Sequence, residues 1–115
     1  MKSTIIAKGI DASQSLREYI MERVDSALVR AQDSINFINI RISDLNGPKG
    51  GVGKRCQIHL KLSGLPTVVV TGVSASIIDA IDYAAQRAAK VVERVLSRAN
   101  AIQPINVPVL RRIAA

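Results

Sequence analysis

Apolar and polar residues alternate in several short segments of the chain, and this pattern predicts β-strands. Isoleucines occupy every second position of residues 38–42 within the segment 36–43, and residues 55–62 alternate in the same way. A period of two is typical of a strand with one covered face. Residues 3–8 and 67–71 are short β-branched runs, so the sequence predicts four strands. The three valines of the last run are more apolar than an edge strand usually tolerates.

Two further segments place apolar residues at steps of three and four, which predicts amphipathic helices. The first begins after Ser13, a good N-cap residue. Its apolar stripe consists of Leu16, Ile20, Val24, Ala27 and Ala31. The second helix runs from Ser76, another N-cap candidate, to about Arg98.

The second helix sorts its side chains into three sectors. With Ile81 set at zero and a step of about 100° per residue, the apolar positions fall within about 60° of zero. Four bases fall between about 180° and 260°, opposite that stripe, and three acids fall between about 100° and 160°. The four bases are Arg87, Lys90, Arg94 and Arg98, and the acids are Asp79, Asp82 and Glu93. A solvated face with charge pairs is the simpler interpretation, and phosphate contact is the functional one.

The order of elements predicts an α+β two-layer fold. Strand, helix, three strands and helix (βαβββα) give a four-stranded mixed sheet with both helices packed on one face, similar in outline to a double-stranded-RNA-binding domain. The strand 3–8, the first helix and the strand 36–43 imply a parallel crossover. We expect one domain over residues 1–99 and an extended or disordered tail over 100–115, which contains two prolines and Arg111-Arg112.

The glycine-rich stretch 49–55 (KGGVGKR) resembles a phosphate-binding loop at first sight. Such a loop needs a Ser or Thr for the magnesium ion and a helix after the glycines. Here Arg55 replaces the hydroxyl, and the following residues alternate as a strand. We therefore interpret the stretch as the tip of a β-hairpin whose charged residues, Lys49, Lys54 and Arg55, contact phosphate as point charges on a mobile turn.

The net charge of +7 lies in one part of the sequence. Residues 1–48 hold six bases and six acids, whereas residues 49–115 hold ten bases and three acids. A local surplus of positive charge favours a polyanionic partner, most commonly nucleic acid. With one Phe, two Tyr and no Trp, the composition argues against single-strand binding by base stacking and favours contacts to the phosphates and shape of folded RNA.

Catalysis and metal binding find little support in the sequence. Cys56 and His59, the only Cys and the only His, have opposite parity on one strand and so point to opposite faces. Cys56 is expected to be a buried core residue and His59 a solvated sheet residue. We expect no enzyme activity, no cofactor and no metal site.

Candidate RNA contacts also occur outside the second helix. On the first helix, Tyr19, Arg23 and Arg30 fall near one edge of the apolar stripe. If the helices pack side by side, that edge joins the four bases of the second helix in one basic surface. The predicted RNA-binding set is Arg23, Arg30, Lys54, Arg55, Arg87, Lys90, Arg94 and Arg98.

Three sequence segments carry a family resemblance. They are Leu16-Arg17-Glu18-Tyr19, the stretch 44–51 (DLNGPKGG) with Lys54 and Cys56, and Ala80-Ile81-Asp82. In this order and spacing, over residues 3 to about 99, the chain resembles the ribosome hibernation-promoting factor and ribosome-associated inhibitor A family, also called sigma-54 modulation proteins. Ser76 and Ile78 depart from the acid and tyrosine that the family often has at the start of the last helix.

The resemblance implies a cytoplasmic, non-enzymatic stress or stationary-phase factor. Such proteins bind the small (30S) ribosomal subunit, with basic helix surfaces on its rRNA in the channel for mRNA and tRNA, and block initiation. By position, the basic helix sites of the family fall on Arg23, Arg30, Arg87, Lys90 and Arg94. The chain looks like a short form of the family, and its oligomeric state stays open.

Two other hypotheses predict different behaviour. A protein-interaction module acting through the sheet or its valine-rich strand would show weak ribosome binding that is insensitive to the bases of the second helix. A nucleotide hydrolase would bind ATP. The sequence has neither a basic leader nor an apolar run near 18 residues, so nothing in it suggests export or a membrane span. We expect no membrane partner. We also expect no small-molecule substrate.

Overall fold

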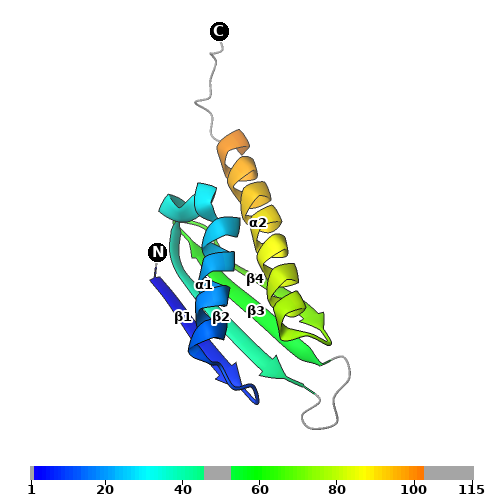
Figure 1. Cartoon of the computed structure of the whole chain (residues 1–115). Helices are drawn as coiled ribbons and strands as arrows, with labels where there is room; N and C mark the ends of the chain where they lie inside the picture. The colour runs from blue at the N-terminus through cyan, green and yellow to red at the C-terminus, as the bar shows by residue number, and fades with distance from the viewer. Residues whose placement is uncertain (1, 46–52, 103–115) are drawn as a thin grey trace.

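The computed structural model describes residues 2–45 and 53–102, and its elements follow the predicted order βαβββα (Figure 1). A short 3-10 helix, η1, is added after the first helix. The elements are β1 (Lys2–Lys8), α1 (Gln14–Ala27), η1 (Val29–Ser34), β2 (Ile35–Asp44), β3 (Lys54–Leu62), β4 (Thr67–Ser74) and α2 (Ile77–Ile102). Both helices lie on the same face of the sheet, so the predicted two-layer α+β fold is confirmed.

The sheet has the order β1-β2-β3-β4. β1 pairs with β2 in parallel, as the strand-helix-strand order predicts, and the other two pairs are antiparallel. Leu45 N–H donates to the carbonyl oxygen of Gly53 at 2.7 Å, which closes the base of the hairpin between β2 and β3. The glycine-rich tip itself, residues 46–52, lies outside the described residues.

Helix α1 begins where the sequence predicts. The side-chain oxygen of Ser13 accepts a hydrogen bond from Leu16 N–H at 3.2 Å, and this satisfies one of the free amides of the first turn. The expectation that its stripe continues on one helix as far as Ala31 is wrong, because α1 ends at Ala27. At Leu28, which is buried, the backbone leaves helical geometry, and the chain tightens into η1 before it enters β2. Ala31 therefore packs against the core from η1, and Arg30 does not lie on α1.

Helix α2 begins after Ser76, whose carbonyl accepts the first helical hydrogen bond from Ala80 N–H at 3.0 Å. It continues past Arg98 to Ile102, so residues 100–102 are helical and not part of an extended tail. The rest of the predicted tail, residues 103–115, lies outside the described residues.

The core lies between the sheet and the two helices. Alternate residues of β2 and β3, among them Ile40, Ile58 and Leu60, are fully buried against Ile20 of α1 and Ile81 of α2. Because the inward set matches the alternation in the sequence, the period of two predicted this face correctly. Among the described residues, all side chains classed as buried are apolar or the thiol of Cys56.

The valine run of β4 is divided between the two faces of the sheet. Val70 is 7% exposed beneath α2, whereas Val69 is 50% exposed on the uncovered face. β4 is an edge strand, since it pairs only with β3 within the sheet. Coverage by α2 therefore accounts for Val68 and Val70, whereas Val69 is an apolar residue of the open face.

Gly72 sets the distance between β4 and α2. A Cβ at this position would lie 2.4 Å from the carbonyl oxygen of Ala80 and 2.7 Å from the amide nitrogen of Ala84. Both are backbone atoms of α2, so the helix rests almost directly on the backbone of the strand. This close contact fixes where the outer face of α2 stands above the edge of the sheet.

Candidate nucleic-acid interface

The four bases of α2 form a single exposed row, as the helical angles predict. Arg87, Lys90, Arg94 and Arg98 are all exposed, and we call them the α2 row. Arg87 and Lys90 line an open hollow together with Thr71 and Val73 of β4. Arg94 lines its continuation beside Val69, so the row follows the flank of α2 that faces the edge strand.

No described residue neutralises the α2 row. None of its four members forms an ion pair with a residue in the described ranges 2–45 and 53–102. Their spacing of three or four residues places neighbouring charges about 5–6 Å apart at Cβ along one side of the helix. Like charges at this spacing repel, and a polyanion that lies along the row relieves this repulsion.

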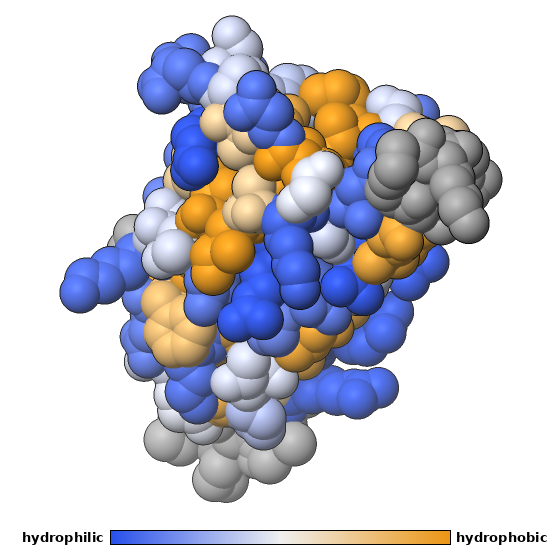
Figure 2. All heavy atoms as spheres, turned by 90° about the horizontal axis from the view of Figure 1, so that it is seen from below, coloured by the Kyte–Doolittle hydropathy of each residue, from blue (hydrophilic) through white to orange (hydrophobic). Residues whose placement is uncertain are grey.

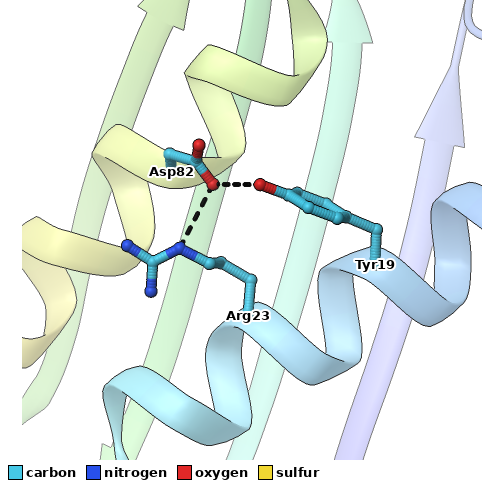
Figure 3. Close-up of polar contacts among 3 residues, drawn as sticks. All are labelled: Tyr19, Arg23 and Asp82. Carbon is cyan, nitrogen blue, oxygen red and sulfur yellow. Dashed lines mark hydrogen bonds and ion pairs between the residues drawn. The ribbon is translucent and has the colours of Figure 1, made fainter.

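The opposite flank of α2 contacts α1 through a polar cluster (Figure 3). Oδ1 of Asp82 accepts a hydrogen bond from the Tyr19 hydroxyl at 2.5 Å and pairs with Nε of Arg23 at 3.2 Å. The hydrogen bond to Asp82, followed by desolvation, raises the pKa of Tyr19 above its ordinary value. Arg23 is thus already paired with a carboxylate between the helices, and this contact defines a structural role for it.

Arg30 is also separated from the α2 row. It lines a groove between the end of α1, η1 and α2, and Glu93 lies in the same groove. The predicted union of Arg23 and Arg30 with the α2 row in one basic surface is not formed, because Asp82 and Glu93 lie on the α1 side of α2. The angles on α2 predicted its acidic sector, but they do not reveal which sector faces α1.

Lys54 and Arg55 belong to strand β3 and not to the hairpin tip. Lys54 is the first residue of β3, and its Nζ lies 2.8 Å from Oδ2 of Asp44 on the paired strand. The interpretation of both residues as charges on a mobile turn is therefore corrected. Lys54 is held by Asp44, whereas Arg55 lies on the uncovered face of the sheet, and Lys49 lies outside the described residues.

Replacing Asp82 with asparagine tests the cluster of Figure 3. We expect the D82N variant to lose about 1 kcal/mol of unfolding free energy, because a charge-assisted hydrogen bond and a partly exposed ion pair are weakened together. A raised Tyr19 pKa means that its contribution to stability is complete below about pH 10 and is lost as the pH rises further. Urea denaturation at neutral pH and near pH 11 measures both effects.

The control for this experiment is Glu22→Gln, which removes an exposed carboxylate from α1. It should leave the unfolding free energy and the titration of Tyr19 unchanged. Ultraviolet titration of the tyrosinate in a Tyr83→Phe background isolates Tyr19, since these are the two tyrosines of the chain. An unchanged Tyr19 pKa in the D82N variant would contradict the assignment of Asp82 as the main cause.

The potentially reactive residues are separated as predicted. Cys56 is fully buried under the helices, and burial raises the pKa of its thiol to about 12, so it is neutral at physiological pH. His59 lies on the opposite face of β3, where its Nε2 is 3.1 Å from Oε1 of Gln57. Within the described residues no three His, Cys, Asp or Glu side chains gather as a metal site.

A two-layer α+β architecture, with a basic row on α2 that pairs with no described residue, defines a class: a small domain suited to binding the phosphates of a nucleic acid. Residues 4–100 match the family model described as "Sigma 54 modulation protein / S30EA ribosomal protein". The chain belongs to this family, and the resemblance drawn from its sequence motifs is confirmed.

Two solved structures have a similar fold. A ribosomal subunit interface protein from Coxiella burnetii superposes with a TM-score of 0.71 at 19% identity, over 84% of this chain and 99% of that one. The N-terminal domain of Protein Y from Thermus thermophilus gives a TM-score of 0.67 at 24% identity, over 83% and 99% of the two chains. At these identities the likeness establishes the fold. No curated protein sequence matches the chain significantly.

Sequence reasoning missed one group of basic residues. Lys2, Lys8, Arg41 and Lys61 lie on strands, on the uncovered face of the sheet, together with Arg55. The signal was available, because these bases have the parity opposite to the buried residues of their strands.

The part of the chain that the structure describes contains no helix long and apolar enough to cross a membrane.

Proposed function

We propose that the protein is a ribosome-associated translation inhibitor, a hibernation factor that binds the rRNA of the small subunit in the channel used by mRNA and tRNA. The observation that carries this proposal is the α2 row, which pairs with no residue that the structure describes, on a domain that belongs to the S30EA ribosomal protein family. One of the two similar structures supports it, since that protein is a ribosomal subunit interface protein.

The α2 row supplies the binding energy by displacing counterions from the RNA backbone. Arg87 and Arg94 present planar guanidinium groups that match a phosphate with two parallel hydrogen bonds, and Lys90 between them adds a point charge. Each phosphate contact releases condensed cations, so affinity falls as salt rises. Arg98 extends the row beyond Arg94 toward the β3–β4 turn.

Inhibition follows from occupancy and requires no chemistry. A rigid domain seated on the rRNA of the channel excludes mRNA and tRNA from the same volume, so initiation cannot proceed while it is bound. Because phosphate contacts form and release without covalent steps, the block is reversible. The protein acts in the cytoplasm under stress or in stationary phase, when silenced ribosomes are preserved for later use.

Co-sedimentation with ribosomal particles across a salt series tests the proposal. Tagged protein should pellet with 30S and 70S particles at low salt and dissociate steeply as salt rises. The logarithm of the association constant should fall linearly with the logarithm of salt, by about 0.7–0.9 for each phosphate contact. Protein that stays in the supernatant with both particles at low salt would refute ribosome binding.

A protein-interaction module acting through the sheet is the second candidate. One observation favours it: Ile6, Phe37, Val69 and Val73 are 40–50% exposed on the uncovered face of the sheet. Figure 2 views the molecule from below, end-on to the two layers, and there apolar side chains form several patches with hydrophilic ones between them. This candidate predicts weak ribosome binding that does not change when the α2 row is neutralised.

A further inference from the structure

The positive charge of the described residues is concentrated on the sheet and not on the helices. Together α1, η1 and α2 carry seven bases and seven acids, so the helical layer as a whole is neutral. The four strands carry six bases and a single acid, Asp44. Asp44 pairs with Lys54. Three of the six strand bases, Lys2, Lys8 and Arg41, come from residues 1–48, whose charges balance along the sequence, so the fold gathers on the sheet a surplus that the linear sequence does not show.

The remaining bases of the strands share the uncovered face. Strand register places Lys8, Ser43, Arg55 and Val73 in one row across the sheet. A second row contains Lys2, Phe37, Lys61 and Thr67, and Arg41 lies between the two rows. The five basic members of this face are Lys2, Lys8, Arg41, Arg55 and Lys61, and we call them the sheet patch.

No described acid neutralises the sheet patch. Seven of the described acids lie on α1, η1 or α2, Asp11 lies in the loop before α1, and Asp44 lies at the end of β2. Lys61 donates a hydrogen bond to the carbonyl oxygen of Leu65, and the other four members form no ion pair within the described ranges. Such an unpaired, one-sign surface on a domain is the electrostatic footprint of a polyanion.

We propose that the sheet patch binds the phosphate backbone of RNA, as a second surface separate from the α2 row. Strand spacing and rise place the Cα atoms of Lys8, Arg41 and Arg55 roughly 8–10 Å apart, so the three cations can each meet a different phosphate. A second copy of this protein would bring like charges together at the sheet patch. The negatively charged backbone or groove of an RNA has the opposite charge and fits the patch. Any folded RNA presents such phosphates, so binding at the sheet patch does not depend on the ribosome.

The two surfaces meet around the edge of the sheet. Thr71 and Val73 of β4 line the hollow that also contains Arg87 and Lys90, and Val73 pairs with Arg55 of the sheet patch. Positive charge therefore continues from the outer flank of α2 around β4 onto the open face. An RNA strand bound along the α2 row can therefore continue around β4 onto the sheet patch. Alternatively, two segments of one folded RNA can bind the two surfaces, with the domain between them.

The open face also contains an unsatisfied polar atom. Oδ1 of Asn39 is covered, yet it accepts no hydrogen bond from any described residue. Asn39 lies between Phe37 and Arg41 on β2, opposite His59. Buried acceptors normally have a donor, and the Asn39 side chain would have to turn outward before a ribose 2′-hydroxyl of bound RNA could supply one.

Binding of a fluorescent RNA hairpin, measured by anisotropy over a salt series, tests the sheet patch. The test variant is Lys8→Gln, Arg41→Gln and Arg55→Gln, which lowers the net charge by three. A matched control lowers it equally on the outer face of α1, with Ser15→Glu, Arg17→Gln and Ser26→Glu, all exposed positions. Circular dichroism establishes that both variants fold.

We expect the test variant to lose about two orders of magnitude in affinity near 0.1 M salt, and its salt slope to fall by about two, as expected for the loss of three phosphate contacts. The control should lose only a few-fold in affinity, because its lower net charge weakens long-range attraction. Its salt slope should equal that of the wild type. Equal slopes for the wild type and the test variant would overturn the proposal. So would wild-type protein that binds no hairpin, or polyglutamate that displaces the hairpin as well as unlabelled RNA does.

Failure of this experiment is distinguishable from failure of the proposed function. The hairpin assay contains no ribosome, and the co-sedimentation assay does not depend on the sheet variant. In one outcome the protein pellets with 30S particles, but the sheet variant binds the hairpin with the wild-type salt slope. The protein would then be a ribosome-binding factor without a second RNA surface. In the other outcome the protein binds the hairpin through the sheet patch but never pellets with ribosomes. The sheet patch would then be an RNA-binding surface, and the proposed ribosomal function would be wrong.

Discussion

Replacing Gly72 with alanine will lower the free energy of unfolding by about 2–3 kcal/mol, because the added methyl group has no room between β4 and α2. The new Cβ would stand 2.4 Å from the carbonyl oxygen of Ala80 and 2.7 Å from the amide nitrogen of Ala84. Backbone atoms in the middle of a helix cannot rotate away as a flexible side chain can. The helix must shift as a whole, or the strand must bend.

Urea denaturation and thermal melting followed by circular dichroism measure this effect. For a domain of about 100 residues, 1 kcal/mol corresponds to about 4–8 °C in Tm, so the G72A variant should melt roughly 10–20 °C below the wild type. Val73→Ala is the control, since Val73 is the neighbouring residue on β4 and is 45% exposed on the other face. It should melt within a few degrees of the wild type. A G72A variant as stable as V73A would show that α2 can move outward at little cost.

The effect of Gly72 also connects packing to binding. Arg87 and Lys90 line their hollow together with Thr71 and Val73, the two residues that flank Gly72. A helix displaced from β4 would therefore carry the α2 row away from the edge of the sheet. The glycine has a function in placing charge as well as in packing.

Periodicity predicted the fold because each element of this protein has one covered face. The alternate isoleucines of β2 and the helical spacing around Ile81 both record which side of an element meets the core. Ser13 gave the start of α1 through a local hydrogen bond that involves only neighbouring residues. Such signals are local, so they can be read without knowing the tertiary structure.

The end of α1 could not be predicted in the same way. Ala27 and Ala31 continue the helical spacing, but the chain must turn at Leu28 to bring β2 beside β1. Tertiary geometry therefore overrides an unbroken local pattern. The consequence for the site is that Arg30, expected on α1, lies in η1.

Charge was the least predictable feature, because its meaning depends on pairing across elements. Arg23 reads as a free base in the sequence, and only the packing of α1 against α2 places it 3.2 Å from Asp82. Arg41 reads as one polar residue of a strand, and only the register places it among four other bases on an acid-free face. The sequence thus locates charges along the chain, whereas the fold decides which of them stay unpaired.

Neutralising three of the four members of the α2 row will weaken binding to 30S particles by about two orders of magnitude near 0.1 M salt. The variant is Arg87→Gln, Lys90→Gln and Arg94→Gln, at three exposed positions that pair with no described residue. Three lost phosphate contacts remove about 0.7–0.9 each from the slope of affinity against salt, so the slope should fall by about two. Fold stability should be almost unchanged, because none of the three side chains is buried.

The matched control is again Ser15→Glu, Arg17→Gln and Ser26→Glu, which gives the same net charge with the α2 row intact. If the row contacts phosphates, the control keeps the wild-type salt slope, because slope counts local contacts while net charge alone changes only long-range attraction. Equal loss in both variants would mean that the ribosome senses overall charge and that the row is an ordinary solvated face. Charge reversal at the same three positions, to Glu, should remove binding altogether, since it replaces each attraction to phosphate by a repulsion.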